Sequence, residues 1–255
     1  MSSLSGKEVL ITRARHQADT LKERLESRGA GVTAVPLLSF VKRDSEENVR
    51  LLENLASYDW VLITSTNGVW FFNELIREYL EAVPEGLKYA TVGPKTKLAL
   101  EEEGRTVSFL PSSYSAEFLV KEWVPMLESN ERVLYVRGNL SRETVREGLK
   151  EHHISFDSMT AYDTLILEEK AAELQDRLRN ESWDALTFFS PSAVEAFCEL
   201  SGTLCNRALD LPCFCIGPTT ERQAADAGFT NIQSPATFTA EALIEKMEEY
   251  FTEKG

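Results

Sequence analysis

Two clusters of hydroxyl side chains stand where buried strands are expected to end. One apolar run stops at Thr64 and Ser65, and another stops at Ser190 and Ser192. Each cluster leads into apolar residues at helical spacing, so a serine should cap each helix, with Pro191 at the first position of the second one. Hydroxyls and free backbone N–H groups past a strand end favour an anionic ligand. We therefore predict two anion-binding half-sites that face each other, although each hydroxyl could also do no more than cap its helix.

The two clusters belong to an internal repeat. Ser65 and Ser190 are 125 positions apart, and an offset of 124 relates Val92–Thr96 to Ile216–Thr220. The same offset of 124 relates Val9–Arg13 to Val133–Arg137. A period this long exceeds that of solenoid repeats, so it indicates a duplicated half-protein in which each copy holds several strand–helix units.

Strands and helices alternate along both copies, which predicts an α/β fold with parallel, doubly wound sheets covered by helices on both faces. We expect strands over 8–12, 89–92, 106–110, 132–136 and 213–216, extended segments over 32–41 and 157–167, and helices over 48–55, 69–80, 95–103, 116–127, 142–151, 168–179 and 240–251. The sequence lacks glycine-rich nucleotide-binding motifs and a nucleophile elbow, so we expect no nucleotide cofactor and catalysis that depends on binding geometry.

Composition excludes several classes of protein. With 27 basic and 41 acidic residues among 255, the net charge is −14, which disfavours nucleic-acid binding. No apolar run has membrane-spanning length, and the N-terminus resembles no export signal, so we expect a cytoplasmic protein. We also expect it to be a monomer. The four cysteines lack metal-ligand spacing and are interpreted as small buried residues, and the His152–His153 pair as a surface loop, so no metal site is predicted.

Several short motifs, in this order and spacing, resemble the uroporphyrinogen-III synthase (HemD) family over nearly the whole chain. They are Val9–Arg13, Pro36–Phe40, Ile63–Ser65, Val92–Gly93, Arg137–Asn139 with Arg142–Glu143, Tyr162–Thr164, Phe188–Ser192 and Ile216–Thr220. The resemblance implies two similar flavodoxin-like lobes joined by a two-stranded antiparallel connector. Lobe 1 would comprise residues 1–35 and 168–255, lobe 2 residues 44–159, and the connecting strands residues 36–43 and 160–167. The sequence alone also permits a contiguous division near residue 128.

The resemblance also implies a reaction without a cofactor. The substrate would be hydroxymethylbilane, a linear tetrapyrrole with acetate and propionate carboxylates on every ring. Loss of its terminal hydroxyl as water would give a cation, and attack by the far ring would form a spiro intermediate. Fragmentation and reclosure would invert that ring to give uroporphyrinogen III. Since the free chain closes without inversion, the protein must impose a geometry, and we expect this in a cleft between two mobile lobes.

The candidate site residues follow from their positions and from the resemblance. Tyr162 resembles the family's active-site tyrosine, whose phenol would hydrogen-bond the departing hydroxyl or stabilise the intermediate. The predicted substrate-binding residues are Arg13, Thr64, Ser65, Thr96, Arg137, Asn139, Arg142, Ser190, Ser192, Thr219 and Thr220. The arginines supply the fixed positive charge that a polyanion needs, unless they form salt bridges within the fold. Where some relatives have a basic residue before Gly217, this sequence has Pro212–Cys215.

A second hypothesis is a two-lobed module that binds or senses a tetrapyrrole or another anion without converting it. The same hinged architecture would serve either function. The sequence carries no DNA-binding segment and no export signal, which disfavours a repressor-type or periplasmic sensor. Analysis of the isomers formed from hydroxymethylbilane would distinguish the enzyme from the binding module.

Overall fold

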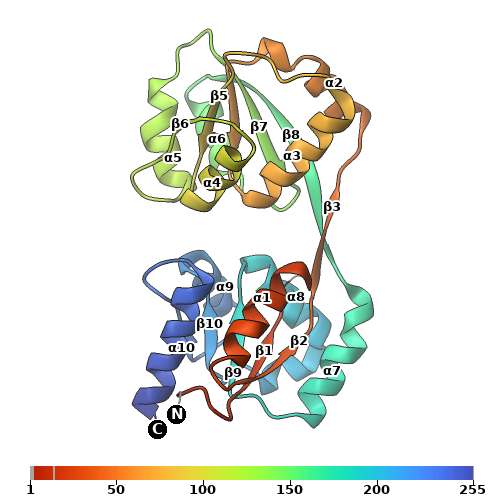
Figure 1. Ribbon diagram of the computed structural model, residues 1–255, viewed down its shortest axis with the longest axis vertical. Helices are drawn as coiled ribbons and strands as arrows, with labels where there is room; N and C mark the ends of the chain where they lie inside the picture. The colour runs from red at the N-terminus through yellow and green to blue at the C-terminus, as the bar shows by residue number, and fades with distance from the viewer. Residues whose placement is uncertain (1–2, 14, 255) are drawn as a thin grey trace. The chain divides into compact units, whose positions relative to one another are not determined.

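The computed structural model of the protein describes residues 3–13 and 15–254. The chain forms two compact units, which we call unit 1 (residues 1–39 and 165–255) and unit 2 (residues 40–164). It passes from unit 1 into unit 2 within strand β3 (Leu38–Lys42) and returns within strand β8 (Ser155–Ile166) (Figure 1). Unit 1 is therefore built from both ends of the chain, and unit 2 from its middle.

Unit 1 contains a five-stranded parallel sheet in the order β11-β10-β9-β1-β2. Its strands are β1 (Glu8–Ile11), β2 (Gly31–Ala34), β9 (Ala185–Phe188), β10 (Cys213–Cys215) and β11 (Ile232–Gln233). Its helices are α1 (Arg15–Glu26), α7 (Ala171–Asn180), α8 (Pro191–Ser201), α9 (Pro218–Asp226) and α10 (Ala240–Lys254), with 3₁₀ turns over Glu168–Lys170 and Gly202–Arg207. Cys205, Cys213 and Cys215 are buried in this unit, as predicted, whereas Cys198 is only partly buried.

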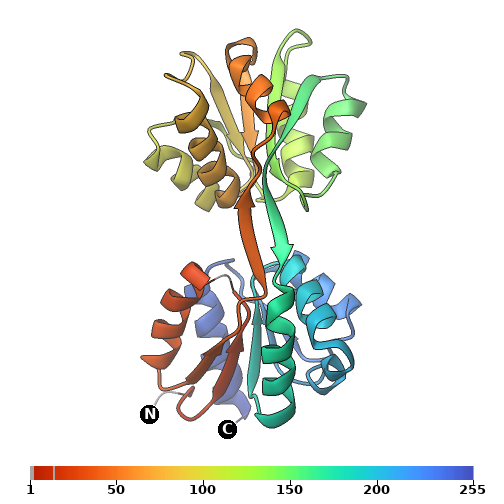
Figure 2. The same ribbon diagram turned by 90° about the vertical axis from the view of Figure 1, so that its right-hand side faces the viewer.

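Alternating side chains of each strand supply the two cores of unit 1. Val9 and Ile11 pack with α1 and α10, whereas Leu10 packs with α7 and α8 on the opposite face. Figure 2 shows these helices on the two sides of the sheet. Because successive strand residues point to opposite faces, a strand covered on both sides must be apolar throughout. This explains why Val9–Ile11 of β1 are all apolar.

Unit 2 contains a six-stranded sheet in the order β3-β8-β7-β4-β5-β6. The strands β4 (Trp60–Ile63), β5 (Lys88–Thr91), β6 (Val107–Phe109), β7 (Arg132–Gly138) and β8 run parallel. The helices are α2 (Glu46–Glu53), α3 (Thr66–Tyr79), α4 (Pro94–Glu102), α5 (Ala116–Trp123) and α6 (Thr144–Glu151), with 3₁₀ turns over Leu55–Ser57 and Val124–Met126. Helices α2, α3 and α4 cover one face, and α5 and α6 cover the other.

Strand β3 pairs with β8 in the opposite direction. Leu167 N donates to Leu37 O at 2.9 Å, and Arg43 N donates to Ala161 O at 2.9 Å, so residue numbers rise on one strand as they fall on the other. The extended segment predicted over 32–41 is in fact two strands, β2 and β3. Pro36 lies between them and has no N–H to donate to a ladder, so the strand is interrupted there.

The duplication is visible in the order of elements. The series β4–α3–β5–α4–β6–α5 of unit 2 is repeated as β9–α8–β10–α9–β11–α10 in unit 1. In unit 2 the strand order reverses between β4 and β7, and in unit 1 between β9 and β1. Ligands of doubly wound sheets bind past the carboxyl ends of the strands at such a reversal. Both predicted hydroxyl clusters follow strands at these points, and the α/β fold with parallel sheets is confirmed.

Most predicted helices are found, with shifted ends. The predicted helix over 168–179 is a 3₁₀ turn followed by α7, and the helix predicted from Arg142 begins at Thr144. The segment 116–127 ends its α-helix at Trp123 and continues as a 3₁₀ turn that contains Pro125. A proline ring collides with the preceding helical turn, which accounts for the predicted break.

A tight contact between α5 and α6 provides a test of this packing. A Cβ atom at Gly148 would lie 2.4 Å from Val120 Cγ1. Gly148→Leu should therefore lower the free energy of unfolding by about 1–3 kcal/mol, because the helices must separate to admit the side chain. Urea denaturation measures this loss. The exposed Glu151 at the end of the same helix is the control, since Glu151→Ala should change stability by less than about 0.5 kcal/mol. Equal stability of the two variants would contradict the close approach.

Candidate functional site

The hydroxyl cluster of unit 2 is built on the junction between β4 and α3. Ser65 has an extended backbone (φ −145°, ψ 152°), and its Oγ accepts the N–H of Gly68 at 3.0 Å. This bond satisfies one of the first N–H groups of the helix and confirms the predicted cap. Thr64 takes another role, because its hydroxyl hydrogen-bonds the phenol of Tyr135 on β7. Burial raises the pKa of that phenol, and the contact with Thr64 partly opposes the rise.

The cluster of unit 1 repeats this geometry at the start of α8. Ser190 Oγ accepts the N–H of Ala193 at 3.1 Å, and Pro191 occupies the first helical position, as predicted. The hydroxyls of Ser190 and Ser192 lie 2.9 Å apart. Both serines are partly exposed, so their remaining hydrogen-bonding capacity is available at the end of β9.

Three of the four predicted threonines lie in the first turns of α4 and α9, where their exposure differs. Thr219 is exposed, whereas Thr96 is 5% exposed and Thr220 is 1% exposed. Thr96 and Thr220 occupy equivalent places in the two copies, and both are buried against the body of their unit. Helix periodicity turns the third position of each helix inward, so these two hydroxyls are poorly placed to reach a ligand. Their predicted role in binding is left without support from the geometry.

Arg13 and Arg137 end equivalent strands but have different surroundings. Arg137 is 7% exposed, and its guanidinium donates to Glu143 Oε1 at 2.8 Å and to the carbonyl oxygens of Gly138 and Ser141. These bonds hold the loop after β7 in place. Arg137 therefore forms a salt bridge within the fold, which was the alternative to a role in binding the polyanion. The guanidinium of Arg13 lies 4.3 Å from the ring centre of Phe189, next to Ser190, and burial lowers its pKa.

Asn139 and Arg142 follow β7. The Oδ1 of Asn139 accepts the N–H of Thr164 at 2.8 Å, and its own N–H donates to Tyr162 O at 3.1 Å, so it extends the pairing of β7 with β8. Arg142 is exposed, and within residues 3–13 and 15–254 no hydrogen bond or ion pair involves its side chain. Of the two, Arg142 is the side chain able to receive an anion.

Tyr162 is 7% exposed and lies beside the unit 2 cluster, where its Oη is 3.2 Å from Ser65 Oγ. Burial raises the pKa of the phenol, and the hydrogen bond with Ser65 acts in the opposite direction. Its ring is stacked on Phe71, with 5.2 Å between ring centres and 23° between planes. Phe71 is partly buried and also packs against the core of unit 2, and sequence reasoning did not identify its contact with the candidate tyrosine.

The structure thus joins five of the predicted residues of unit 2 through short contacts. Thr64 and Arg137 both approach Tyr135 on β7. Asn139, just after β7, pairs through its backbone with Tyr162, and the phenol of Tyr162 meets Ser65. In unit 1, Arg13, Ser190 and Ser192 lie around the end of β9. The phenols of Tyr135 and Tyr162 can donate a proton, and the capping hydroxyls and helix N-termini can bind carboxylates. None of these groups is a covalent nucleophile with an adjacent base.

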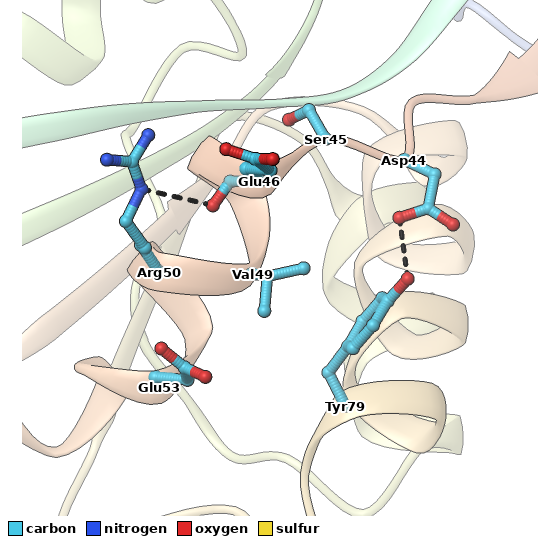
Figure 3. A pocket seen from close by; sticks show the side chains of 7 residues that line it. All are labelled: Asp44, Ser45, Glu46, Val49, Arg50, Glu53 and Tyr79. Atoms are coloured by element: carbon cyan, nitrogen blue, oxygen red, sulfur yellow. Dashed lines mark hydrogen bonds between the residues drawn. The ribbon is translucent and has the colours of Figure 1, made fainter.

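Two open cavities of unit 2 contain none of the predicted residues. One, of about 470 Å³, is lined by Asp44, Ser45, Glu46, Val49, Arg50, Glu53 and Tyr79 (Figure 3). Three of these residues are carboxylates, and Tyr79 donates to Asp44 at 2.6 Å, so a polyanion would be repelled there. The other cavity, about 550 Å³, is lined by Glu47, Arg50, Leu51, Asn54, Ser57, Tyr58, Arg132 and Asp157.

Within the described parts of the chain, no group of His, Cys, Asp and Glu could hold a metal ion, and no helix is long and apolar enough to cross a membrane.

Comparison with known proteins gives one consistent family. A family model described as uroporphyrinogen-III synthase HemD matches residues 4–245. The porphyrin biosynthesis protein HemD of Ruminiclostridium josui is 28% identical over 249 residues, which cover 96% of this chain and 49% of that protein. This chain therefore spans about half the length of that relative. The uroporphyrinogen-III synthase of Chlorobaculum parvum is 29% identical over 204 residues, which cover 77% of this chain and 80% of that protein.

A solved structure shares the fold. The crystal structure of a mutant uroporphyrinogen III synthase from Thermus thermophilus matches with a TM-score of 0.73, at 18% identity, over 98% of this chain and 100% of that one. At this identity the likeness supports the fold, whereas the family assignment depends on the sequence matches.

The different surroundings of Arg137 and Arg142 lead to a prediction about stability. Arg137→Ala should lower the free energy of unfolding by about 2–3 kcal/mol, because it leaves the carbonyl oxygens of Gly138 and Ser141 without their charged donor. Arg142→Ala removes an exposed side chain and should change stability by less than about 0.5 kcal/mol. Urea denaturation followed by circular dichroism compares the two. A loss in Arg142→Ala as large as in Arg137→Ala would contradict the assignment of Arg137 to the loop.

Proposed function

The chain belongs to the uroporphyrinogen-III synthase (HemD) family, and on that premise we propose that it converts hydroxymethylbilane into uroporphyrinogen III. The observation that carries the proposal is the family match over residues 4–245, together with two named relatives that cover most of this chain. The Ser65–Tyr162 pair at the end of β4 gives the proposal a chemical centre.

The proposed reaction makes and breaks bonds within one substrate molecule. The terminal hydroxyl of hydroxymethylbilane takes up a proton and leaves as water, and the resulting cation is attacked by the far ring at its substituted carbon. Fragmentation of the spiro intermediate and reclosure invert that ring, and a final proton loss gives the neutral product. The enzyme's task is to hold the chain so that the crowded bond forms first, which is a matter of orientation.

The carboxylates of the substrate are proposed to bind at the hydroxyl clusters and at exposed cationic groups. Ser190, Ser192 and Thr219 of unit 1 lie at helix N-termini, and so do the first backbone N–H groups of α3 in unit 2; the partial positive charge of these termini favours anions. Arg142 offers an exposed guanidinium that no described group of the chain neutralises. Fixed cations are needed because the net charge of −14 otherwise opposes the approach of a polyanion.

Tyr162 is proposed to be the proton donor for the departing hydroxyl. Since burial raises the pKa of its phenol, the group stays protonated throughout the neutral range and retains a proton to give. The direction of this shift implies that turnover should not decline through loss of the Tyr162 proton until the pH exceeds the usual value for tyrosine, about 10. A monomeric state and a cytoplasmic location remain predictions from the sequence.

The decisive assay supplies freshly generated hydroxymethylbilane, oxidises the products and separates the porphyrin isomers. The type III isomer should dominate, because only an enzyme that imposes ring inversion diverts the substrate from spontaneous closure. A parallel reaction without protein gives the type I background. Binding of the substrate with a product ratio equal to that background would leave the non-catalytic binding module as the function.

Two variants separate chemistry from binding. Tyr162→Phe should lower kcat on the order of 10²-fold, because it removes the proposed proton donor and keeps the aromatic stack. Arg142→Ala should chiefly raise KM, because it removes a charge used in binding rather than in the reaction. Steady-state kinetics of type III formation measure both. If Tyr162→Phe retained the kcat of the unmodified protein, Tyr162 would be removed from the catalytic role.

A further inference from the structure

Three neighbours restrict the ring of Tyr162. Phe71 stacks on one side, and Phe40 approaches edge-on with 6.0 Å between ring centres. On Gly138 a Cβ atom would lie 2.5 Å from Tyr162 Cζ and 2.8 Å from Tyr162 Oη. Real Cβ atoms do not approach this closely, so the ring occupies space that only glycine leaves open. The position of the phenol therefore depends on Gly138.

An irregularity in strand pairing brings these two residues together. Arg137 pairs with Thr160, but the next residue, Gly138, pairs with Tyr162, so Ala161 is an extra residue on β8. Such a bulge re-aims the side chains that follow it. In a regular ladder Gly138 would face Ala161. The bulge and the glycine together place the phenol over the end of β7.

Ser65 has one remaining hydrogen-bond donor, and Tyr162 is the group it meets. Its Oγ already accepts the N–H of Gly68, which leaves its own O–H to donate. Tyr162 Oη, at 3.2 Å, is the one other hydrogen-bonding partner of Ser65 Oγ among the described residues. A hydroxyl that accepts a backbone N–H becomes a better donor, and the positive end of α3 favours negative charge on the oxygen it faces. This arrangement suits a phenol that is giving up its proton.

The other copy of the repeat provides an internal comparison. Ser190 makes the same capping bond, 3.1 Å against 3.0 Å for Ser65, but its second partner is the hydroxyl of Ser192. The position equivalent to Tyr162, at an offset of 124, holds Leu38, which is 5% exposed. The cap is therefore common to both units, while the phenol beside it is particular to unit 2.

We propose that Ser65 and Gly138 are positioning residues for Tyr162: Gly138 admits the ring, and Ser65 donates a hydrogen bond to Oη as the phenol loses its proton. This inference rests on the proposed function. In the step considered, the O–H bond of Tyr162 breaks, its proton goes to the departing hydroxyl, and water leaves. The phenolate is held by the Ser65 O–H at the start of α3 until the cyclised cation returns a proton to it. Ser65 thus serves the reaction through Tyr162 in addition to capping its helix.

The test introduces 3-fluorotyrosine at position 162, which gives one ¹⁹F signal and a phenol that ionises at lower pH than tyrosine. In the full chain, Ser65→Ala should lower the ionisation constant of that phenol by about tenfold or more, since a hydrogen bond to a charged oxygen is lost. Ser65→Thr should restore it. Ser190→Ala removes the equivalent cap in unit 1 and should leave the ¹⁹F titration unchanged. An unchanged titration in Ser65→Ala would overturn the role of Ser65.

Turnover separates this inference from the proposed function. With Tyr162 itself in place, Ser65→Ala should lower kcat about tenfold with little change in KM, and Ser65→Thr should recover it. If the titration shifts while kcat does not, the hydrogen bond stands and the catalytic role of Tyr162 fails.

Gly138→Ala tests the second half of the proposal. It should move the ¹⁹F signal of position 162 and lower kcat as strongly as Tyr162→Phe does. It should also destabilise the unmodified protein more than it destabilises a Tyr162→Ala variant, in which the ring is absent. Gly93→Ala, where a Cβ meets nothing within 4 Å, is the control for the ¹⁹F signal. An unmoved signal and equal destabilisation in both backgrounds would overturn the role of Gly138.

Discussion

The bond from the Gly68 N–H to Ser65 Oγ determines the geometry of the candidate site in unit 2. It fixes where α3 begins, and so it sets the direction of the first N–H groups of the helix at the end of β4. The same oxygen lies 3.2 Å from the phenol of Tyr162, so one hydroxyl joins the helix start to the proposed proton donor. The sheet order then brings the end of β7 alongside, with Gly138 beneath the ring.

Duplication supplied two equivalent corners, and they have diverged in chemistry. Both keep a capping serine, a following helix and an arginine at the end of the adjacent strand. In unit 2 that arginine is buried in its own loop, whereas in unit 1 Arg13 lies over Phe189. The phenol is present beside one serine only. The proposed function accounts for this division, because both copies would bind carboxylates but only one would supply a proton.

The sequence was sufficient for the fold because the duplication and the strand–helix alternation are long-range patterns that many residues share. The two serine caps were also predictable, since a polar residue between a strand and a helix has few other roles. The directions in which side chains point could not be predicted from the sequence. Thr96 and Thr220 stand near helix starts like the capping serines, yet they lie three positions past the cap, where the side chain turns inward. The partners of Arg137 lie within six residues of it, but a loop conformation decides whether they meet.

The contact of Gly138 with Tyr162 depends on a bulge, and a one-residue change of register has no local signature in the sequence. The glycine after Arg137 was the one available indication, because a glycine beside a strand often marks a place where another group approaches the backbone closely. An aromatic side chain on a helix is expected in a core, and Phe71 does pack there. Its other contact required knowledge of which strand lies beside α3.

The two crossings of the chain between the units have a consequence for synthesis on the ribosome. Strand β1 lies between β2 and β9, and β9 begins only at Ala185, so the first sheet lacks its central partner until late in translation. Unit 2 is complete once residue 164 has emerged, and it can fold while the first 39 residues still lack their partner strand β9. The nascent chain therefore has to keep the apolar residues of its first β–α–β segment from aggregating while the inserted unit is made.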